Sequence, residues 1–259
     1  MQIAPATLAS ARRTVAAYDE TFLATGGIDL SPLGRSLKAT IWADDPKVGK
    51  VRHGFVSSPL NGAGGPDAWT FAGTLVPDGS FVEWLDDFDA FLVASPWLSS
   101  RRVHRGFLRF YNSLTVQPVS GAEQPMRDFI RANPMASEGA IFEGHSLGTA
   151  TATFACLDAS GAFLYLFAAP KPGDGGFRQA VFGSIEKVSG TIESYANPND
   201  VVPRVPLTVD WPWKVEDFEH VVEPVELAAN LASPGIPADW ASSHHMPNYL
   251  RLLEAASTT

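Results

Sequence analysis

Cysteine is almost absent from this chain: Cys156 is the single cysteine among 259 residues. One cysteine cannot form an internal disulfide or a cysteine-rich metal site. Small secreted folds depend on several disulfides to hold them together. The count therefore argues against a disulfide-stapled secreted protein.

Long apolar runs are also missing. No stretch approaches the roughly 18–20 uncharged apolar residues of a transmembrane helix. Near the N-terminus, Arg12 and Arg13 are followed by Asp19 and Glu20, and no apolar core of a signal peptide lies between them. We therefore expect a soluble protein without a transmembrane segment, and the sequence leaves its compartment open.

Positive charge is scarce. The chain has 19 Lys and Arg residues against 28 Asp and Glu residues, a formal net charge of −9. Its basic residues form no cluster that could follow a phosphate backbone, which argues against nucleic acid as a partner. With 45% hydrophobic residues there is enough apolar material for a large core. Because no linker, repeat or low-complexity tract interrupts the chain, we predict one domain over residues 1–259.

Strand and helix patterns alternate in the second half of the chain. This alternation predicts an α/β fold with a mostly parallel central sheet and helices on both faces. The expected strands cover residues 139–143, 162–168 and 191–196, and the expected helices 147–157 and 176–184.

Three further patterns concern the ends of the chain. Apolar residues from Leu8 to Phe22 recur at spacings of three and four, which predicts one helix over about 6–24. The proline-rich region 207–239 reads as loops with a hairpin around Phe218–Leu227. Pro247 suits the first turn of a final helix.

The chemistry centres on residues 144–148, Gly-His-Ser-Leu-Gly, between an expected strand and an expected helix. A serine in this motif sits on a sharp, strained turn with its hydroxyl raised above the sheet edge. Gly144 and Gly148 leave room for the turn, since a side chain at either position would strike the adjoining backbone. The N–H of Leu147, at the start of the helix, would face a developing oxyanion. Ser146 is therefore the candidate nucleophile, although three fixed positions can also arise by chance.

A nucleophilic serine needs an imidazole to take its proton and an acid to orient that imidazole. In an α/β-hydrolase the acid follows the serine, and the histidine follows the acid. Asp200 lies in a turn just after an expected strand and is the leading acid. Asp174 and Asp210 are its rivals.

The histidines that follow Asp200 are His220, His244 and His245. The His244–His245 pair stands at the entrance to the last helix, where an imidazole could reach the sheet edge. No Asp, Glu, Cys or further His stands at metal-ligand spacing around the pair, so we expect neither a metal nor a cofactor. Spacing alone leaves the choice of base open.

An aromatic segment over about residues 75–98 follows the Gly73-Thr74 turn. Its spacing fits a core-facing amphipathic helix. Its position fits a movable lid whose apolar face covers a substrate groove. The candidate lid and substrate-binding residues are Phe81, Trp84, Leu85, Phe88 and Trp97.

A series of blocks over residues 67–250 resembles, in order, the class 3 lipases, the family that contains the fungal triacylglycerol lipases and plant acylhydrolases. The block at 144–148 matches the family's Gly-His-Ser-Leu-Gly at every residue, and the block at 69–74 is similar to its strand ending in Phe-Arg-Gly-Thr, with Ala72 in place of the arginine. The other blocks cover residues 83–87, 103–107, 167–174, 197–206 and 244–249.

This resemblance implies an α/β-hydrolase fold and a set of roles. Ser146 would be the nucleophile, Asp200 the acid, and the N–H of Thr74 the second oxyanion donor beside Leu147. The pattern at 244–249 selects His244 as the base. His245 remains the alternative base, because the fungal members space the following tyrosine differently. The first 60 residues resemble no block of the family.

The resemblance implies a serine-dependent carboxylic ester hydrolase of the triacylglycerol lipase type, acting on lipid esters through an acyl-enzyme. Phospholipase A1 activity and short-chain or feruloyl-type esterase activity are alternatives. A lipase-like binding protein without activity is a further alternative from another class. Neither the natural ester nor the oligomeric state follows from the sequence.

Overall fold

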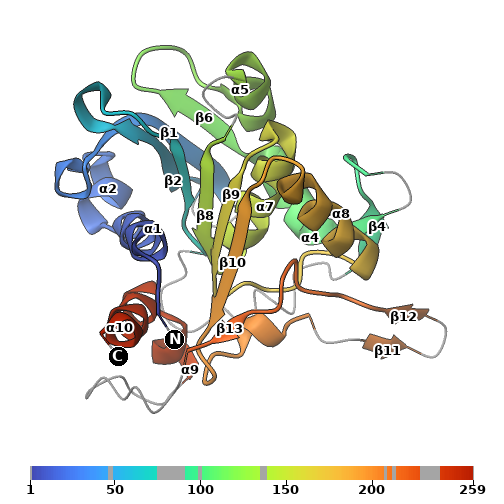
Figure 1. Cartoon of the computed structure of the whole chain (residues 1–259). Helices are drawn as coiled ribbons and strands as arrows, with labels where there is room; N and C mark the ends of the chain where they lie inside the picture. Colours follow the sequence, from blue (N-terminus) through green and yellow to red (C-terminus); the bar gives the residue numbers. More distant parts are fainter. Residues whose placement is uncertain are drawn as a thin grey trace.

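The computed structural model describes residues 2–45, 49–74, 91–98, 101–134, 139–206, 209–211, 214–227 and 240–258. At its centre is a nine-stranded sheet in the order β13-β10-β9-β8-β3-β2-β1-β6-β7 (Figure 1). The strands are β1 Arg35–Asp45, β2 Gly49–Pro59, β3 Ala68–Phe71, β6 Thr115–Pro118, β7 Gln124–Pro125, β8 Ile141–His145, β9 Phe163–Phe167, β10 Thr191–Ala196 and β13 Val225–Glu226. Two separate hairpins pair β4 Leu92–Ala94 with β5 Arg102–His104, and β11 Val209–Trp211 with β12 Lys214–Glu216.

The central sheet is mixed. Strands β3, β8, β9, β10 and β13 run parallel to one another. On the other side of β3 the neighbours β2, β1, β6 and β7 pair antiparallel. Three residues separate β1 from β2, and so short a connection permits only an antiparallel pair, whereas parallel neighbours need a crossover. The parallel arrangement that we predicted therefore holds for one half of the sheet.

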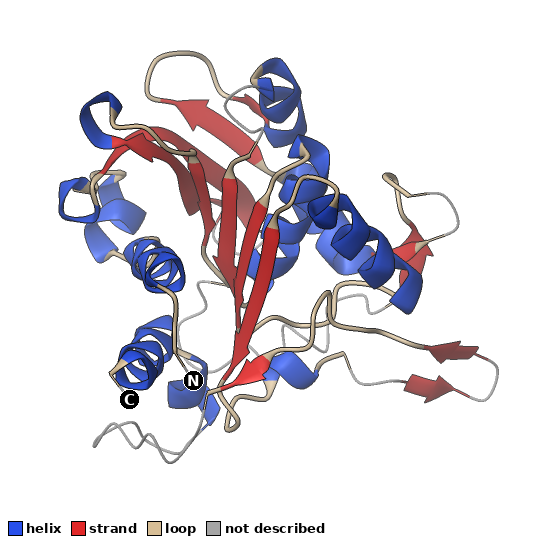
Figure 2. Cartoon of the chain, viewed as in Figure 1, coloured by secondary structure: helices blue, strands red, loops and turns tan. Residues whose placement is uncertain are grey.

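Helices cover both faces of the sheet, as predicted (Figures 1 and 2). On one face lie α4 Arg105–Ser113, α5 Met126–Ala132, α7 Leu147–Ala159 and α8 Gly175–Glu186; on the other lie α1 Pro5–Ala16 and α10 Met246–Ser257, which pack against each other. The short helices are α2 Glu20–Thr25 and α9 Trp240–His244, with 3-10 turns at Ser31–Leu33, Leu60–Gly62 and Val202–Arg204. Within the described ranges, no helix is long and apolar enough to cross a membrane.

Helix α7 runs through the core on its face of the sheet. Its residues 147–156 are all buried, and most of them are small. Small side chains let the helix lie close to β8 and β9, while Phe154 fills the space against neighbouring aromatic rings. This packing fixes the residue at the start of α7, which is Ser146 at the N-cap.

The N-terminal helix differs from the prediction. Instead of one helix over about 6–24, α1 ends at Ala16 and α2 begins at Glu20. Asp19 starts the second helix, because its side chain accepts a hydrogen bond from the N–H of Phe22 at 3.0 Å. In the break, the side chain of Tyr18 reaches Gly73 in the loop that follows β3. Apolar spacing alone could not reveal this cap.

The hairpin expected around Phe218–Leu227 is also wrong. Strand β13 adds to the sheet as a parallel neighbour of β10, and the N–H of Leu227 donates to the carbonyl of Ala196 at 2.8 Å. Val221 is buried in the core on the way to that strand. The hairpin of this region lies earlier, at β11 and β12.

Helix α1 is fastened to the sheet by a buried ion pair. Arg13 donates through Nε at 2.8 Å and Nη2 at 2.6 Å to the two carboxylate oxygens of Glu143 in β8. The hydroxyl of Thr70 in β3 donates to the same carboxylate at 2.6 Å. The carboxylate is fully buried, so its charge depends on these donors.

We expect Arg13→Met to lower the free energy of unfolding by about 3–5 kcal/mol, because it leaves the Glu143 carboxylate buried without its cation. Urea unfolding followed by circular dichroism measures the change. Arg12→Met is the matched control on the same helix, since Arg12 pairs with Glu254 where both side chains are about half exposed. We expect the control to cost less than about 1 kcal/mol. Equal losses in the two variants would contradict the special role of the buried pair.

Candidate active site

Three segments that follow parallel strands meet at one edge of the sheet. Gly73 and Thr74 follow β3, Ser146 follows β8, and the loop 197–203 follows β10. The carboxyl ends of parallel strands lie at a common edge, and open α/β sheets bind their ligands outside that edge. The topology therefore gathers the candidate residues from distant parts of the chain.

The turn between β8 and α7 is strained, as the motif predicts. Ser146 has φ 57° and ψ −130°, a conformation that residues with a side chain rarely adopt. A Cβ at Gly144 would lie 2.3 Å from the carbonyl oxygen of Gly148, and a Cβ at Gly148 would lie 2.4 Å from that of Ala72. Only glycine fits at either position. Thr149 holds the turn through two bonds to the Ser146 carbonyl, from its hydroxyl at 2.7 Å and its N–H at 2.9 Å.

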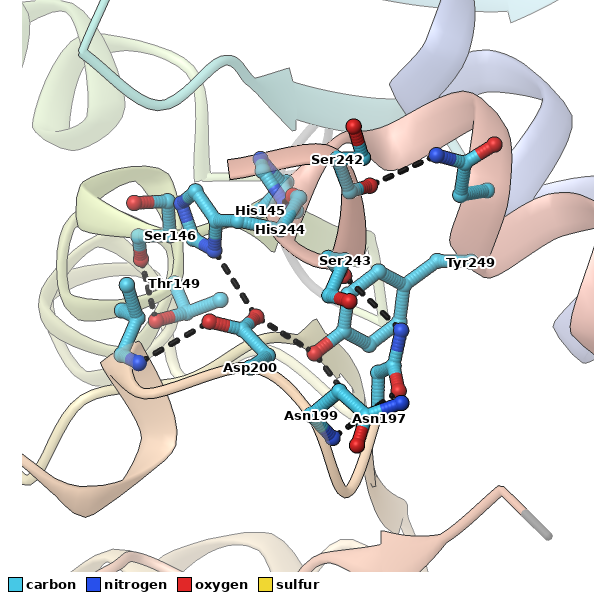
Figure 3. A network of polar contacts seen from close by, with 12 residues as sticks. His145, Ser146, Thr149, Asn197, Asn199, Asp200, Ser242, Ser243, His244 and Tyr249 are labelled. Atoms are coloured by element: carbon cyan, nitrogen blue, oxygen red, sulfur yellow. Dashed lines mark hydrogen bonds and ion pairs between the residues drawn. The ribbon is translucent and has the colours of Figure 1, made fainter. Parts of the chain in front are cut away.

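The hydroxyl of Ser146 is enclosed. Its Oγ is buried and has no hydrogen-bond partner among the described residues. Figure 3 shows Ser146 in one cluster with His244 and Asp200, and the ring of the adjacent His145 lies 4.6 Å from the ring of His244. The structure thus brings together a serine, a histidine and an aspartate that are far apart in the sequence.

Asp200 holds the imidazole of His244. Its Oδ2 accepts from His244 Nδ1 at 2.8 Å and from the hydroxyl of Tyr249 at 2.7 Å, and its Oδ1 accepts from the N–H of Val202 at 2.9 Å. A carboxylate acceptor requires the proton on Nδ1, so the hydrogen-bond pattern assigns the acceptor role in neutral His244 to Nε2. Both side chains are largely removed from solvent.

The loop that carries Asp200 is fixed by a second layer of bonds. The backbone N–H of Asn197 donates to the hydroxyl of Tyr249 at 2.9 Å, and its side-chain amide donates to the carbonyl of Ser243 at 3.0 Å (Figure 3). Burial raises the pKa of Tyr249 well above its usual value, and the neighbouring Asp200 adds to the shift. Tyr249 therefore stays protonated and keeps donating to Asp200.

Thr74 and Leu147 both belong to backbone close to Ser146. Leu147 is the first residue of α7, and its side chain is buried. The backbone at Gly73 approaches the serine so closely that a Cβ there would lie 2.7 Å from Ser146 Cβ. The N–H groups of residues 74 and 147 therefore belong to backbone that directly adjoins the serine.

A sequence profile described as Lipase (class 3) matches residues 69–210, which is more than half of the chain. The chain belongs to the class 3 lipase family. The match contains most of β3 and the turn at Thr74 that follows it, the turn around Ser146 and the loop of Asp200.

A lipase sequence and several solved structures are similar to this chain. A lipase of Rhizomucor miehei is 29% identical over 136 residues, which are 49% of this chain and 35% of the relative, so the matched stretch spans about a third of the relative's length. The solved structure of Rhizomucor miehei triacylglyceride lipase has a TM-score of 0.60 at 20% identity and covers 86% of this chain and 79% of its own. A triacylglycerol lipase with a serine protease triad as its catalytic centre has a TM-score of 0.57 at 20% identity, over 92% and 89% of the two chains. These likenesses confirm the predicted α/β-hydrolase fold.

The rival site residues of this class 3 lipase family member make other contacts than His244 and Asp200 do. Asp174 caps helix α8 by accepting from the N–H of Phe177 at 2.8 Å. Asp210 belongs to β11, in a separate hairpin. His245 is exposed, while its neighbour His244 is buried. His220 lines a cavity of about 300 Å³ that also borders Asp200, and burial lowers the pKa of its imidazole.

Most of the candidate lid, with Phe81, Trp84, Leu85 and Phe88, lies outside the described residues. Trp97 is described, and it stacks on Phe154 at 5.0 Å between ring centroids. Its Nε1 donates to Asp158 at 2.6 Å, near the C-terminal end of α7. Trp97 thus packs toward the end of α7 that lies away from Ser146.

Two residues that contact the site, Tyr18 and His145, were not among the site residues predicted from the sequence. Tyr18, from the break between α1 and α2, bonds to the N–H of Gly73 at 2.5 Å and to His145 at 2.6 Å. His145 in turn bonds to the carbonyl of His244 at 2.7 Å.

Within the described ranges, no three side chains of His, Cys, Asp or Glu lie close enough together to hold a metal ion.

Proposed function

We propose that the protein is a serine-dependent carboxylic ester hydrolase that acts on lipid esters, of the triacylglycerol lipase type. The observation that carries the proposal is the buried contact of His244 with Asp200 beside a serine on a strained turn. Membership of the class 3 lipase family supports the same chemistry.

In the proposed reaction, Ser146 Oγ attacks the acyl carbonyl while His244 Nε2 takes the hydroxyl proton. Catalytic hydrogen bonds are often long in a free enzyme and tighten only with substrate, which accommodates the unpartnered Ser146 Oγ. Asp200 stabilises the imidazolium that forms. The imidazolium then protonates the leaving alcohol, and water, activated in the same way, hydrolyses the acyl-enzyme.

The tetrahedral oxyanion would be held by the backbone N–H groups of Thr74 and Leu147. Loss of one such donor typically raises the barrier by about 3–4 kcal/mol. Both groups belong to backbone next to Ser146, and this proximity supports the proposed roles.

A lipid substrate is supported by the relative from Rhizomucor miehei, which is a lipase. The sequence of the candidate lid, about residues 75–98, adds a dense set of aromatic and aliphatic side chains that suit an acyl chain. Phospholipase A1 activity and short-chain or feruloyl-type esterase activity use the same chemistry and differ in the ester cleaved.

We expect a fluorophosphonate probe to label the protein at Ser146, because only a serine activated by its imidazole reacts with it. Mass spectrometry of the labelled peptide measures the site. A series of nitrophenyl esters, with and without a lipid interface, then separates the substrates, and we expect turnover to persist with long acyl chains. Activity confined to short acyl chains would remove the lipase assignment. Failure to label would favour a lipase-like binding protein.

A further inference from the structure

The hydroxyl of Tyr18 lies between the loop after β3 and the turn around Ser146. Tyr18 Oη is 2.5 Å from the N–H nitrogen of Gly73 and 2.6 Å from Nδ1 of His145. On the other side of the same ring, His145 Nε2 is 2.7 Å from the carbonyl oxygen of His244. One tyrosine and one imidazole thus connect the proposed oxyanion loop to the backbone of the proposed base.

The direction of each hydrogen bond follows from its partners. A carbonyl can only accept, so His145 Nε2 carries a proton and donates to His244. In a neutral ring Nδ1 is then an acceptor, so the Tyr18 hydroxyl donates to it. The lone pairs of that hydroxyl accept the N–H of Gly73. We call these three hydrogen bonds, from Gly73 through Tyr18 and His145 to His244, the relay. Reversing the direction of one bond would leave a neighbouring group without its donor or acceptor.

Burial keeps both members of the relay neutral. Burial lowers the pKa of His145 well below its usual value, and the imidazoles of His244 and His245 act in the same direction, while the bond to the His244 carbonyl opposes them. Burial also raises the pKa of the Tyr18 hydroxyl above its usual range. The donors and acceptors are therefore the same throughout the pH range in which an esterase works.

The position of Tyr18 is fixed by the contacts of the preceding helix, α1, with the sheet. The buried pair of Arg13 with Glu143 joins α1 to β8, and Thr70 joins the same carboxylate to β3. Those two strands end at the loop of Gly73 and at the turn of Ser146. Arg13 of α1 thus contacts the carboxylate that links β3 and β8, and the Tyr18 hydroxyl contacts Gly73 and His145 near the ends of the same two strands.

We propose that Tyr18 is a positioning residue for the reaction, whose hydroxyl fixes the Gly73-Thr74 backbone and, through His145, the backbone of His244. This inference rests on the proposed hydrolase function. The Gly73 peptide leads directly to the N–H of Thr74, so freedom at Gly73 displaces an oxyanion donor. The first residues of the chain, which resemble no block of the family, would then supply a part of the catalytic centre.

Tyr18→Phe tests the role, because it keeps the ring and removes only the hydroxyl. We expect kcat on a nitrophenyl ester to fall about 10–100-fold with KM within about twofold, since misplacement of catalytic groups costs up to about 10²-fold. Tyr111→Phe is the matched control: it also removes a buried hydroxyl, whose 2.7 Å bond to Asp158 lies at the far end of α7. We expect its kcat to equal that of the wild type.

Two readouts separate positioning from general stability. Affinity for an alkyl boronic acid, which forms a tetrahedral adduct with serine, should fall in parallel with kcat in Tyr18→Phe, while affinity for a free fatty acid stays unchanged. The double variant Tyr18→Phe/His145→Gln should lose no more activity than the worse single variant, because residues of one relay act as a unit. An equal loss of activity in Tyr111→Phe would overturn the inference.

The wild-type protein serves as the reference for the proposed function. If it turns over ester and Tyr18→Phe keeps the same kcat and boronic acid affinity, the inference fails and the hydrolase stands. If the wild type neither turns over ester nor reacts with a fluorophosphonate, the proposed function fails and the inference falls with it.

Discussion

Ser146→Ala should lower ester hydrolysis by about 10⁶-fold in kcat, the loss expected when the nucleophile of a triad is removed. No other hydroxyl can replace it, because the turn presents this one side chain at the edge of the sheet beside His244. Turnover of a nitrophenyl ester, with burst titration of the wild type to count active sites, measures the loss.

The same variant should keep its fold. Alanine carries the same Cβ as serine, so the strain at φ 57° is unchanged. The deleted Oγ is buried and has no partner among the described residues, so its removal leaves no donor or acceptor stranded. The free energy of unfolding in urea should change by less than about 1 kcal/mol, because the substitution breaks no hydrogen bond and removes only one atom.

Ser194→Ala is the control for this experiment. Ser194 lies in β10, and its hydroxyl is also buried without a partner in the described part of the chain. The two variants therefore remove the same group from comparable surroundings, and only one of them should lose activity. A loss of activity in Ser146→Ala no larger than that in Ser194→Ala would refute the proposed nucleophile.

His244→Ala should cost about 10⁵–10⁶-fold in kcat, because a triad works as a unit and the loss of its base is nearly as severe as the loss of its nucleophile. His245→Ala should stay within about twofold, as expected for a substitution at an exposed position. The two residues are neighbours, so any disturbance of the loop is shared between the variants.

The Asp200 carboxylate keeps two donors in His244→Ala, the hydroxyl of Tyr249 and the N–H of Val202, so the acid loop should remain folded. The rate of fluorophosphonate labelling is a second measure, since it depends on activation of Ser146 and on no particular ester. The reverse ranking of the two histidine variants would assign the base to His245.

The sequence predicted those features that depend on residues close together in the chain. The turn at Ser146 follows from two positions where only glycine fits, and β10 has the boundaries that the sequence pattern predicts. The order of Ser146, Asp200 and His244 along the chain reflects the order of parallel strands, which the alternation of elements indicates.

Contacts between residues that lie far apart in the sequence could not be predicted. Tyr18 reads as one more apolar position of a helix, because its partners Gly73 and His145 lie 55 and 127 positions away. The bond of Trp97 to Asp158 is hidden in the sequence for a similar reason, because the two residues lie 61 positions apart. The antiparallel half of the sheet follows from the short connection between β1 and β2, which the alternating second half of the chain does not reveal.

The contact between α1 and α10 has a consequence for the way the protein reaches its working form. Tyr18 near one end and His244 and Tyr249 near the other meet around His145 in the middle. During synthesis α1 is made long before α10, so the contact between the two helices can form only after residues 246–257 have emerged. During refolding, activity should therefore return in the last kinetic phase, after the secondary structure and most of the burial of aromatic rings have been recovered.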